Sequence, residues 1–191
     1  VGILSLQGDF SAHAGVLKAL GADPVLVRSP EQLDLVEGLI IPGGESTTML
    51  KLVNEEGLLD PLVGFAARHP LLGTCAGSIL MAADVTSPRQ PGLGLVDISI
   101  ERNAYGRQVD SAIRAVSPRG EFLARTSPGE IEAVFIRAPI IRRVGSGVHV
   151  LAEDAGHPIL VEQGRHLVAT FHPELSQDRR VHQLFLQKIQ G

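Results

Sequence analysis

The only cysteine of the chain lies where an apolar run meets a run that suits a helix. Residues 71–80 read LLGTCAGSIL, so Cys75 is the centre of a G-x-C-x-G pattern between Gly73 and Gly77. Flanking glycines permit a sharp turn from strand to helix, which exposes the central side chain near the positive end of the helix. Such surroundings favour the nucleophilic thiolate. The pattern therefore indicates a catalytic cysteine, although a lone cysteine can equally be a small buried core residue.

A candidate base follows the last predicted strand. His172 lies two residues before Glu174, and Pro173 between them restricts the backbone, so both side chains can point into one site. A carboxylate that holds the ring and stabilises the imidazolium would complete a Cys-His-Glu triad. The alternative is a surface His-Glu pair without catalytic function. The remaining histidines have no comparable neighbours in the sequence: His13, His69, His149, His157, His166 and His182. No spacing indicates a metal site.

A glycine-rich loop is the third candidate. Residues 42–48 read PGGESTT and follow a predicted strand directly. Adjacent glycines at the carboxyl end of a strand let backbone N–H groups face a ligand. The loop lacks the lysine of a P-loop and the third glycine of a dinucleotide site. A plain turn followed by a helix N-cap remains the alternative.

The elements that would position these residues alternate between strands and helices. We predict strands at residues 1–6, 24–27, 38–42 and 71–74, and helices at 10–20, from 30 onward, at 47–53, 58–68 and 78–83. Apolar strands that alternate with helices are typical of a mostly parallel sheet covered on both faces. Further strands are predicted at 96–101, 109–116, 133–138, 148–153, 158–163 and 166–171, and a closing helix at 178–189. We therefore expect one α/β domain over residues 1–191, a flavodoxin-like three-layer sandwich with added antiparallel strands.

The composition argues against several classes of function. The net charge is −4, and the sequence pI of about 6.0 argues against a surface for nucleic acid or anionic membrane. One cysteine excludes an internal disulfide, so we expect a cytoplasmic protein. No apolar run approaches the ~20 residues of a membrane span, and no signal peptide is recognisable. The chain opens on an apolar strand, so we expect a short preceding piece, at least the initiator Met.

Six tracts occur in an order that resembles a known family. They are LQG at 6–8, PGGESTTM at 42–49, GTCAG at 73–77, ERNAYGRQ at 101–108 with Asp110 and Ser111, FIRAP at 135–139 and FHPEL at 171–175. The chain resembles the class I, or triad, glutamine amidotransferases. Within them it resembles the PdxT family, the glutaminase subunits of pyridoxal 5'-phosphate synthase. The resemblance spans nearly the whole chain and is weakest at residues 112–132.

The resemblance implies hydrolysis of L-glutamine to L-glutamate and ammonia without a cofactor or metal. Cys75 would be the nucleophile, His172 the base and Glu174 its orienting carboxylate. The N–H groups of Gly44 and Ala76 would form the oxyanion hole. The residues that would contact glutamine are Gly44, Glu45, Ser46, Arg102, Ile136 and Arg137. For the two arginines, structural ion pairs with carboxylates such as Glu101 or Asp110 are the alternative. We also expect Arg137 to lie in an otherwise apolar strand.

The resemblance also implies a partner. Ammonia would pass through a hetero-oligomeric complex to a separate (β/α)8 barrel subunit that builds pyridoxal phosphate. No nucleic acid or membrane is expected to take part. A γ-glutamyl hydrolase and a non-catalytic interaction subunit remain as alternatives; the first would need a longer substrate groove, and the second would be expected to have lost a triad member.

Overall fold

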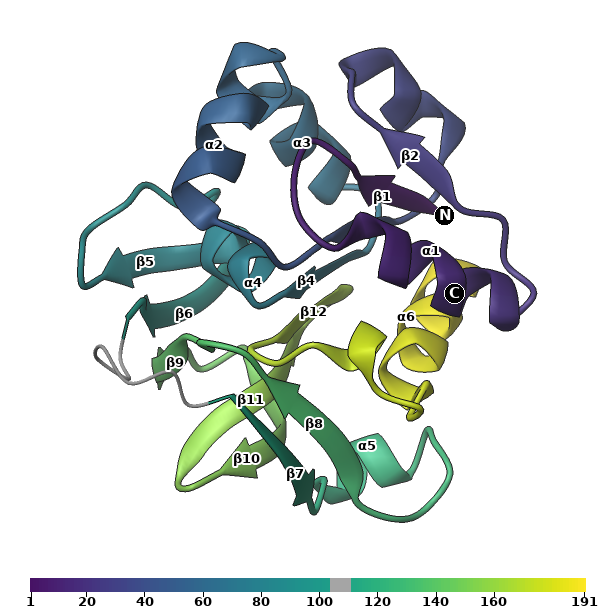
Figure 1. Ribbon diagram of the computed structural model, residues 1–191, viewed down its shortest axis with the longest axis vertical. Coiled ribbons are helices and arrows are strands. Elements are labelled where there is room, and N and C mark those ends of the chain that lie inside the picture. Colours follow the sequence, from purple (N-terminus) through teal and green to yellow (C-terminus); the bar gives the residue numbers. More distant parts are fainter. Residues whose placement is uncertain (104–110) are drawn as a thin grey trace.

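The computed structural model describes residues 1–103 and 111–191, and a central sheet organises them (Figure 1). In spatial order its seven strands are β10 (His149–Asp154), β11 (His157–Gln163), β12 (His166–Ala169), β4 (Leu71–Thr74), β3 (Leu39–Ile41), β1 (Gly2–Leu4) and β2 (Val25–Val27). From β12 to β2 all neighbours are parallel, whereas β11 is antiparallel to both of its neighbours. The predicted fold class, a mostly parallel sheet with added antiparallel strands, is confirmed.

Helices cover both faces of the sheet because its strands are apolar on both sides. Ile3, Ile40 and Leu72 pack into one core with α1 (Phe10–Ala19), α5 (Gly120–Leu123) and α6 (Arg180–Gln190). Alternate residues of the same strands, such as Leu39 and Leu71, pack into a second core. That core also contains η1 (Pro30–Leu35), α2 (Ser46–Glu55), α3 (Leu59–Ala66) and α4 (Ala76–Met81). Side chains that alternate between faces therefore produce the three layers.

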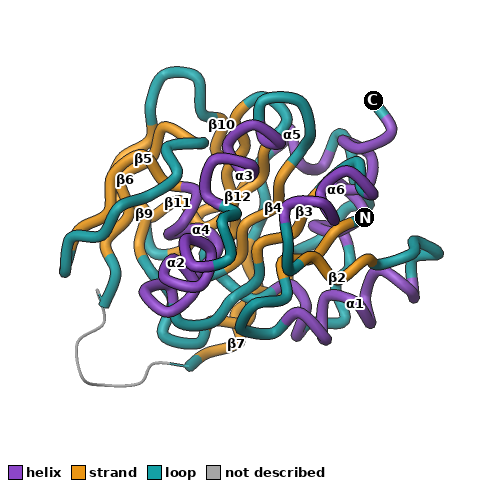
Figure 2. Tube along the Cα trace, turned by 90° about the horizontal axis from the view of Figure 1, so that it is seen from above, coloured by secondary structure: helices purple, strands orange, loops and turns teal. Residues whose placement is uncertain are grey.

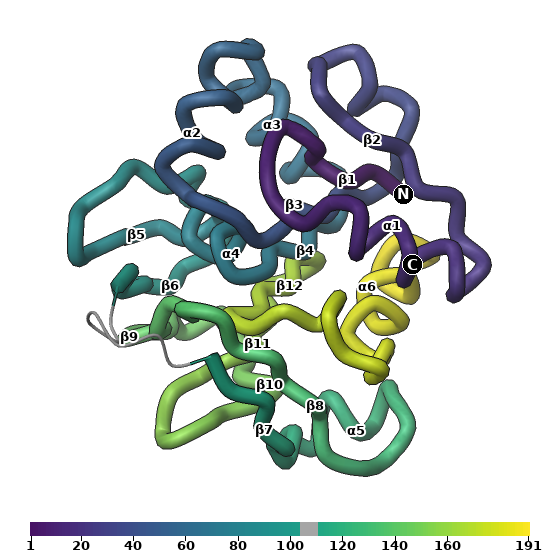
Figure 3. Tube along the Cα trace, viewed as in Figure 1, coloured from purple at the N-terminus to yellow at the C-terminus, as the bar shows by residue number. Residues whose placement is uncertain are grey.

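The first and last helices lie side by side although they are far apart in the sequence. The trace in Figure 3 places α1 next to α6, and buried side chains of the two helices contact one another. The two ends of the chain consequently pack together on one face of the sheet. Because the two helices pair, residues that no local sequence pattern connects come together behind the carboxyl ends of the strands.

Two smaller sheets complete the fold. One contains β5 (Ala82–Thr86), β6 (Val96–Glu101) and β9 (Ile140–Val144), and the other pairs β7 (Ala112–Val116) with β8 (Ile131–Phe135). The three-stranded sheet lies at the end of the molecule opposite the two chain termini (Figure 2). As its alternating pattern predicts, β6 is half-exposed, but it pairs in parallel with β5 and antiparallel only with β9.

Several predicted boundaries were wrong. The helix expected at 78–83 begins at Ala76 and ends at Met81, because Ala82 is extended and starts β5. Neither β5 nor β9 nor the short α5 was predicted. The strand expected at 133–138 lies at 131–135 instead. The predicted strand at 109–116 begins at Ala112, and its first two residues, like 104–108 of the ERNAYGRQ tract, lie outside the described residues. Within the described residues, no helix combines the length and apolarity needed to cross a bilayer.

Candidate active site

Four neighbouring parallel strands end at the same edge of the sheet and place the predicted residues there. His172 and Glu174 follow β12, Cys75 follows β4, Gly44 follows β3, and the loop that leads to α1 follows β1. In a parallel sheet the carboxyl ends of adjacent strands meet, which is why loops of open α/β sheets form sites at that edge. The strand order thus brings residues from four distant parts of the sequence together.

Cys75 occupies a strained turn between β4 and α4, as the G-x-C-x-G pattern predicts. Its φ and ψ angles are 46° and −104°, a conformation that few residues other than glycine adopt. Its N–H donates to the carbonyl of Ala169 on β12 over 2.9 Å. A Cβ atom at Gly77 would lie 2.0 Å from the carbonyl oxygen of Ile41, so only glycine lets α4 approach β3 this closely. The turn therefore fixes the thiol at the positive end of α4.

His172 and Glu174 form a buried pair beside the cysteine. His172 Nδ1 lies 2.7 Å from Glu174 Oε1, and both side chains are almost fully buried. The N–H of His172 donates to the carbonyl of Val134, which anchors the loop to β8. A Cβ atom at Gly43 would lie 2.5 Å from His172 Cε1 and 3.4 Å from the Cys75 Cβ. The ring and the thiol-bearing residue therefore flank the same glycine.

The surroundings of His172 favour its protonated form. Burial lowers the pKa of His172, but its interactions with the Cys75 thiol and the Glu174 carboxylate outweigh burial and raise the pKa to about 10. The imidazolium is therefore the main form at neutral pH. A cation beside a thiol favours the thiolate.

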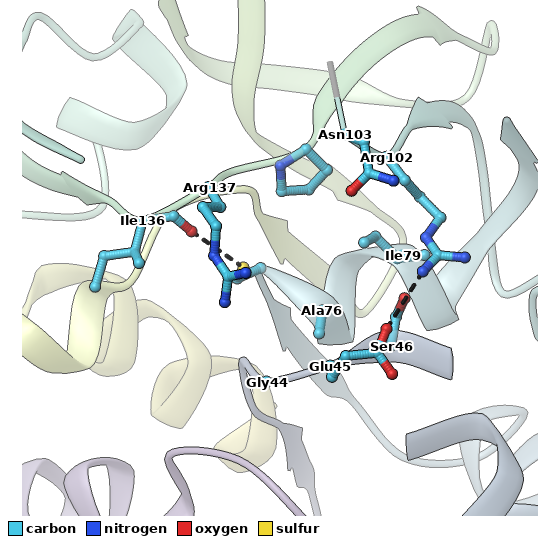
Figure 4. Close-up of a pocket in the computed structure, with 11 residues that line it drawn as sticks. Gly44, Glu45, Ser46, Ala76, Ile79, Arg102, Asn103, Ile136 and Arg137 are labelled. Carbon is cyan, nitrogen blue, oxygen red and sulfur yellow. Dashed lines mark hydrogen bonds and ion pairs between the residues drawn. The ribbon is translucent and has the colours of Figure 1, made fainter. Parts of the chain in front are cut away.

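A pocket of about 140 Å³ opens above Cys75 (Figure 4). Its lining contains every predicted site residue except the buried His172 and Glu174. The lining residues are Gly44, Glu45, Ser46, Cys75, Ala76, Ile79, Arg102, Asn103, Ile136, Arg137 and Pro139. Figure 4 shows Arg102 and Arg137 on opposite sides of the pocket. Two guanidinium groups, one of them paired with Glu45, and the N-terminal end of α4 suit an anionic group of a ligand.

Arg102 is held by the glycine-rich loop. Its Nη2 atom lies 2.9 Å from Thr47 Oγ1 and 3.4 Å from Glu45 Oε1. Glu45 also caps α2, because its carboxylate accepts from the N–H groups of Thr47 and Thr48. Glu101 bonds to Arg142 instead, and Asp110 lies outside the described residues. The alternative of a structural ion pair therefore holds for Arg102, with Glu45 as the carboxylate in place of Glu101. The loop is thus both a helix cap, as the alternative interpretation proposed, and a wall of the pocket.

Arg137 lies in a turn, so the expectation that it belongs to an apolar strand was wrong. β8 ends at Phe135, and Arg137 has a φ of 46° and is exposed. This conformation turns the preceding residue toward the cysteine: the carbonyl oxygen of Ile136 lies 4.0 Å from Cys75 Sγ, while the Ile136 side chain points away (Figure 4). In the described part of the chain Arg137 forms no ion pair.

The peptide between Gly43 and Gly44 has a defined orientation. The carbonyl of Gly43 accepts a hydrogen bond from the N–H of Asp9 over 3.2 Å. In a trans peptide the N–H points the opposite way, so the Gly44 N–H faces away from Asp9. Gln7 packs against this peptide and accepts from the N–H of Glu45 over 3.1 Å. Ser46 donates to Gln90 over 3.0 Å, so its hydroxyl is already engaged.

Sequence reasoning missed three residues near the triad. His13 on α1 and His182 on α6 are fully buried behind Glu174, and His13 Nε2 lies 3.4 Å from Glu174 Oε2. Asp9 is the third: one of its carboxylate oxygens, a ring nitrogen of His172 and a carboxylate oxygen of Glu174 all lie within 4.8 Å of one another. A signal was present, because His13 lies on the apolar face of its helix, four residues before the buried Leu17.

Known proteins are similar to this chain over nearly its whole length. The SNO glutamine amidotransferase family profile matches residues 3–191. The chain is 62% identical over 189 residues to "Pyridoxal 5'-phosphate synthase subunit PdxT" of Solibacter usitatus, covering 99% of this chain and 98% of that protein. It is 53% identical to the protein of the same name from Koribacter versatilis, covering 100% and 96%.

A solved structure agrees with these sequence relationships. "Crystal structure of glutamine amidotransferase" superimposes with a TM-score of 0.90 at 44% identity, covering 100% of this chain and 98% of that chain. The alignment covers the whole of this chain. The chain therefore belongs to the SNO glutamine amidotransferase family.

Proposed function

We propose that this chain, as one domain over residues 1–191, is the glutaminase subunit of a pyridoxal 5'-phosphate synthase. It hydrolyses L-glutamine to L-glutamate and ammonia. The observation that carries the proposal is the convergence of Cys75, His172 and Glu174 from adjacent parallel strands beneath one pocket. The family membership and the name of the two bacterial relatives support the same function.

The first half of the reaction releases ammonia. The Cys75 thiolate attacks the side-chain amide carbon of glutamine, and the carbonyl oxygen takes up the negative charge. The imidazolium of His172 then gives its Nε2 proton to the amide nitrogen, the C–N bond breaks, and ammonia leaves. A γ-glutamyl thioester on Cys75 remains. The raised pKa of His172 supports this step, because the proton is in place before the substrate arrives.

The second half regenerates the enzyme. Forming the thioester removes the thiolate charge, which is one of the causes that raise the pKa of His172. The neutral ring can then take a proton from water, and the resulting hydroxide attacks the thioester carbonyl. The C–S bond breaks, His172 returns the proton toward sulfur, and glutamate leaves. Glu174 forms no covalent bond in the reaction. It accepts a hydrogen bond from the Nδ1–H of the His172 ring and keeps Nε2 directed at the reacting atoms.

The remaining pocket residues serve the oxyanion and the substrate. The N–H of Ala76 follows the nucleophile at the start of α4 and supplies one oxyanion donor. The N–H of Gly44 supplies the second when its peptide faces the thiol. Arg102 and Arg137 suit the α-carboxylate of glutamine, while Glu45 suits its ammonium group. Ser46 and the carbonyl of Ile136 complete the polar contacts.

The proposed partner is the (β/α)8 barrel subunit of the synthase, which would receive the ammonia in a hetero-oligomeric complex. The relatives' names describe a subunit of that synthase, and a subunit that makes ammonia needs an acceptor nearby. We place the reaction in the cytoplasm, where thiols are kept reduced, as the default compartment for a chain with a single, unpaired cysteine.

The test is glutamine turnover by the purified chain, alone and with increasing amounts of the synthase barrel subunit. We expect low activity alone and strong stimulation by the partner, with none from Cys75→Ser in either condition. A γ-glutamyl peptide serves as the alternative substrate and should be cleaved far more slowly than glutamine. The absence of glutamine hydrolysis at saturating partner, or faster cleavage of the peptide, would refute the proposed function.

A further inference from the structure

A second imidazole lies on the far side of the Glu174 carboxylate. Oε1 of Glu174 faces His172, while Oε2 lies 3.4 Å from Nε2 of His13. Nε2 of His13 is also 3.2 Å from the hydroxyl oxygen of Thr74, the residue before the nucleophile. Nδ1 of His13 lies 2.9 Å from Nε2 of His182 on α6. All five of these side chains are buried.

We propose that His13 is a positioning residue of the glutaminase: its Nε2–H donates to Glu174 and holds the carboxylate, and through it His172, in line with Cys75. This inference rests on the proposed function, because it assigns a residue to the same reaction. His13 contacts neither the pocket nor the thiol, so it acts only through Glu174 and Thr74.

The hydrogen-bond partners indicate which ring nitrogens carry protons. Burial lowers the pKa of His182 to about 4 and, together with the neighbouring His182 and His172, lowers that of His13. Both rings are therefore neutral, with one donor and one acceptor each. Two buried polar atoms have no hydrogen-bond partner among the described residues: Oε2 of Glu174 and Nδ1 of His182. Oε2 of Glu174 faces Nε2 of His13 across 3.4 Å. An N–H on Nδ1 of His182 would be an unsatisfied buried donor, so the His182 proton lies on Nε2 and is donated to His13 Nδ1.

That assignment determines the next hydrogen bond. Because His13 Nδ1 accepts from His182, the His13 proton lies on Nε2 and points toward Thr74 Oγ1 and Glu174 Oε2. The reverse arrangement would leave an orphaned N–H on His182 and place a lone pair of His13 against Oε2 of Glu174. An ionised carboxylate with no exposed surface is costly without donors on both oxygens. The donors therefore run from His182 to His13, whose Nε2–H is within hydrogen-bond distance of Thr74 Oγ1 and faces Glu174 Oε2 across 3.4 Å.

The arrangement explains why one residue can organise the site. His13 belongs to α1, Thr74 to the strand that carries the nucleophile, and Glu174 to the loop that carries the base. The ring thus bridges the two halves of the triad from behind. Besides Cys75, the exposed Asp9 at the start of the same helix is a titratable group close to His172 and Glu174.

Two substitutions at one position separate donation from packing. His13→Gln places an amide N–H near the original Nε2, whereas His13→Asn reaches only the Nδ1 position and loses the donor to Glu174. Both side chains are smaller than the ring and polar. In the complex with the synthase subunit we expect His13→Asn to lower kcat roughly ten- to hundredfold with KM within about twofold of the wild type. His13→Gln should recover most of that loss. His69→Asn, in the connection between α3 and β4, serves as the control.

A double-mutant cycle with Glu174→Gln tests the route of action. If His13 acts through Glu174, adding His13→Asn to Glu174→Gln should lower kcat little further, whereas a general structural defect would multiply the two losses. Unchanged kcat in His13→Asn, or multiplied losses in the double variant, would overturn the inference. Wild-type turnover in the same assay shows whether the proposed function itself holds.

The wild-type protein provides a test that needs no variant. Nitrogen-15 NMR of the imidazoles distinguishes a protonated ring nitrogen from a bare one. We expect protons on Nε2 of His13 and on Nε2 of His182. A proton on Nδ1 of His13 would reverse the direction of donation and refute the inference even if the His13 variants failed to fold.

Discussion

Replacing Glu174 with glutamine tests the geometry of the triad most directly. The substitution keeps the shape of the side chain and removes its charge. An amide has one accepting oxygen and one donating NH2, whereas the carboxylate accepts on Oε1 from His172, 2.7 Å away, and faces His13 with Oε2. The amide can therefore satisfy His172 only by turning its NH2 toward His13. The orientation of the catalytic ring should loosen in consequence.

The expected loss can be worked out from this contact. A buried hydrogen bond to a charged group contributes about 1.5–3 kcal/mol, which corresponds to roughly ten- to hundredfold in kcat. His172→Asn should be more severe, because it removes the proton donor and base itself and leaves only background turnover. The pKa of His172 should also fall below about 10, since its interaction with Glu174 is one of the causes that raise it.

The assay combines glutamine turnover in the presence of the synthase subunit with an NMR titration of the imidazoles. Glu153→Gln, at a half-exposed carboxylate paired with Arg119, is a matched control and should leave both measurements unchanged. The reasoning would be refuted if Glu174→Gln were as damaging as His172→Asn. It would equally be refuted if the pKa of His172 stayed near 10 in the variant.

Three further expectations follow from the site and its buried groups. Cys75→Ser should keep the fold but abolish ammonia release, and a diazo-ketone analogue of glutamine should label the wild type at Cys75 and fail to label the variant. Turnover by the variant above a small fraction of the wild-type rate would contradict a nucleophilic role of Cys75. The free energy of unfolding should be greatest near pH 6.5. It should fall as pH rises toward 10, because the pKa of His172 is raised in the folded protein, and fall as pH drops toward 4, because the pKa of His182 is lowered in the folded protein. Chemical denaturation across this pH range measures the free energy of unfolding, and a profile that is flat with pH would contradict the expectation. We expect the synthase subunit to activate the chain by turning the Gly44 N–H toward the oxyanion, so Gly44→Ala should still bind that subunit in sedimentation experiments but should not be fully activated by it. The glycine has a φ of 153°, and an added Cβ would lie 2.6 Å from Gln7 Oε1, which hinders the turn of the peptide. Normal stimulation of the variant would show that activation does not depend on this peptide.

Local patterns in the sequence were enough to predict much of this protein. The alternation of apolar strands and helices predicted the fold class, because strands of a parallel sheet that are buried on both faces are apolar throughout in the sequence. The strand-to-helix turn at Cys75 could be predicted because its glycines are required by backbone geometry within three residues. The pairing of His172 with Glu174 was predictable for the same reason, since only Pro173 separates them.

Tertiary structure decided the contacts that join distant segments. Arg102 bonds to Glu45, which is 57 residues away, and not to its sequence neighbour Glu101. His13 and His182 are 169 residues apart, yet they meet behind the triad because α1 and α6 pack on the same face of the sheet. A buried histidine reads in the sequence only as a polar residue on an apolar helix face. The residue that such a histidine contacts depends on which strands are neighbours in the sheet and which helices cover the same face. The packing of the whole chain determines both.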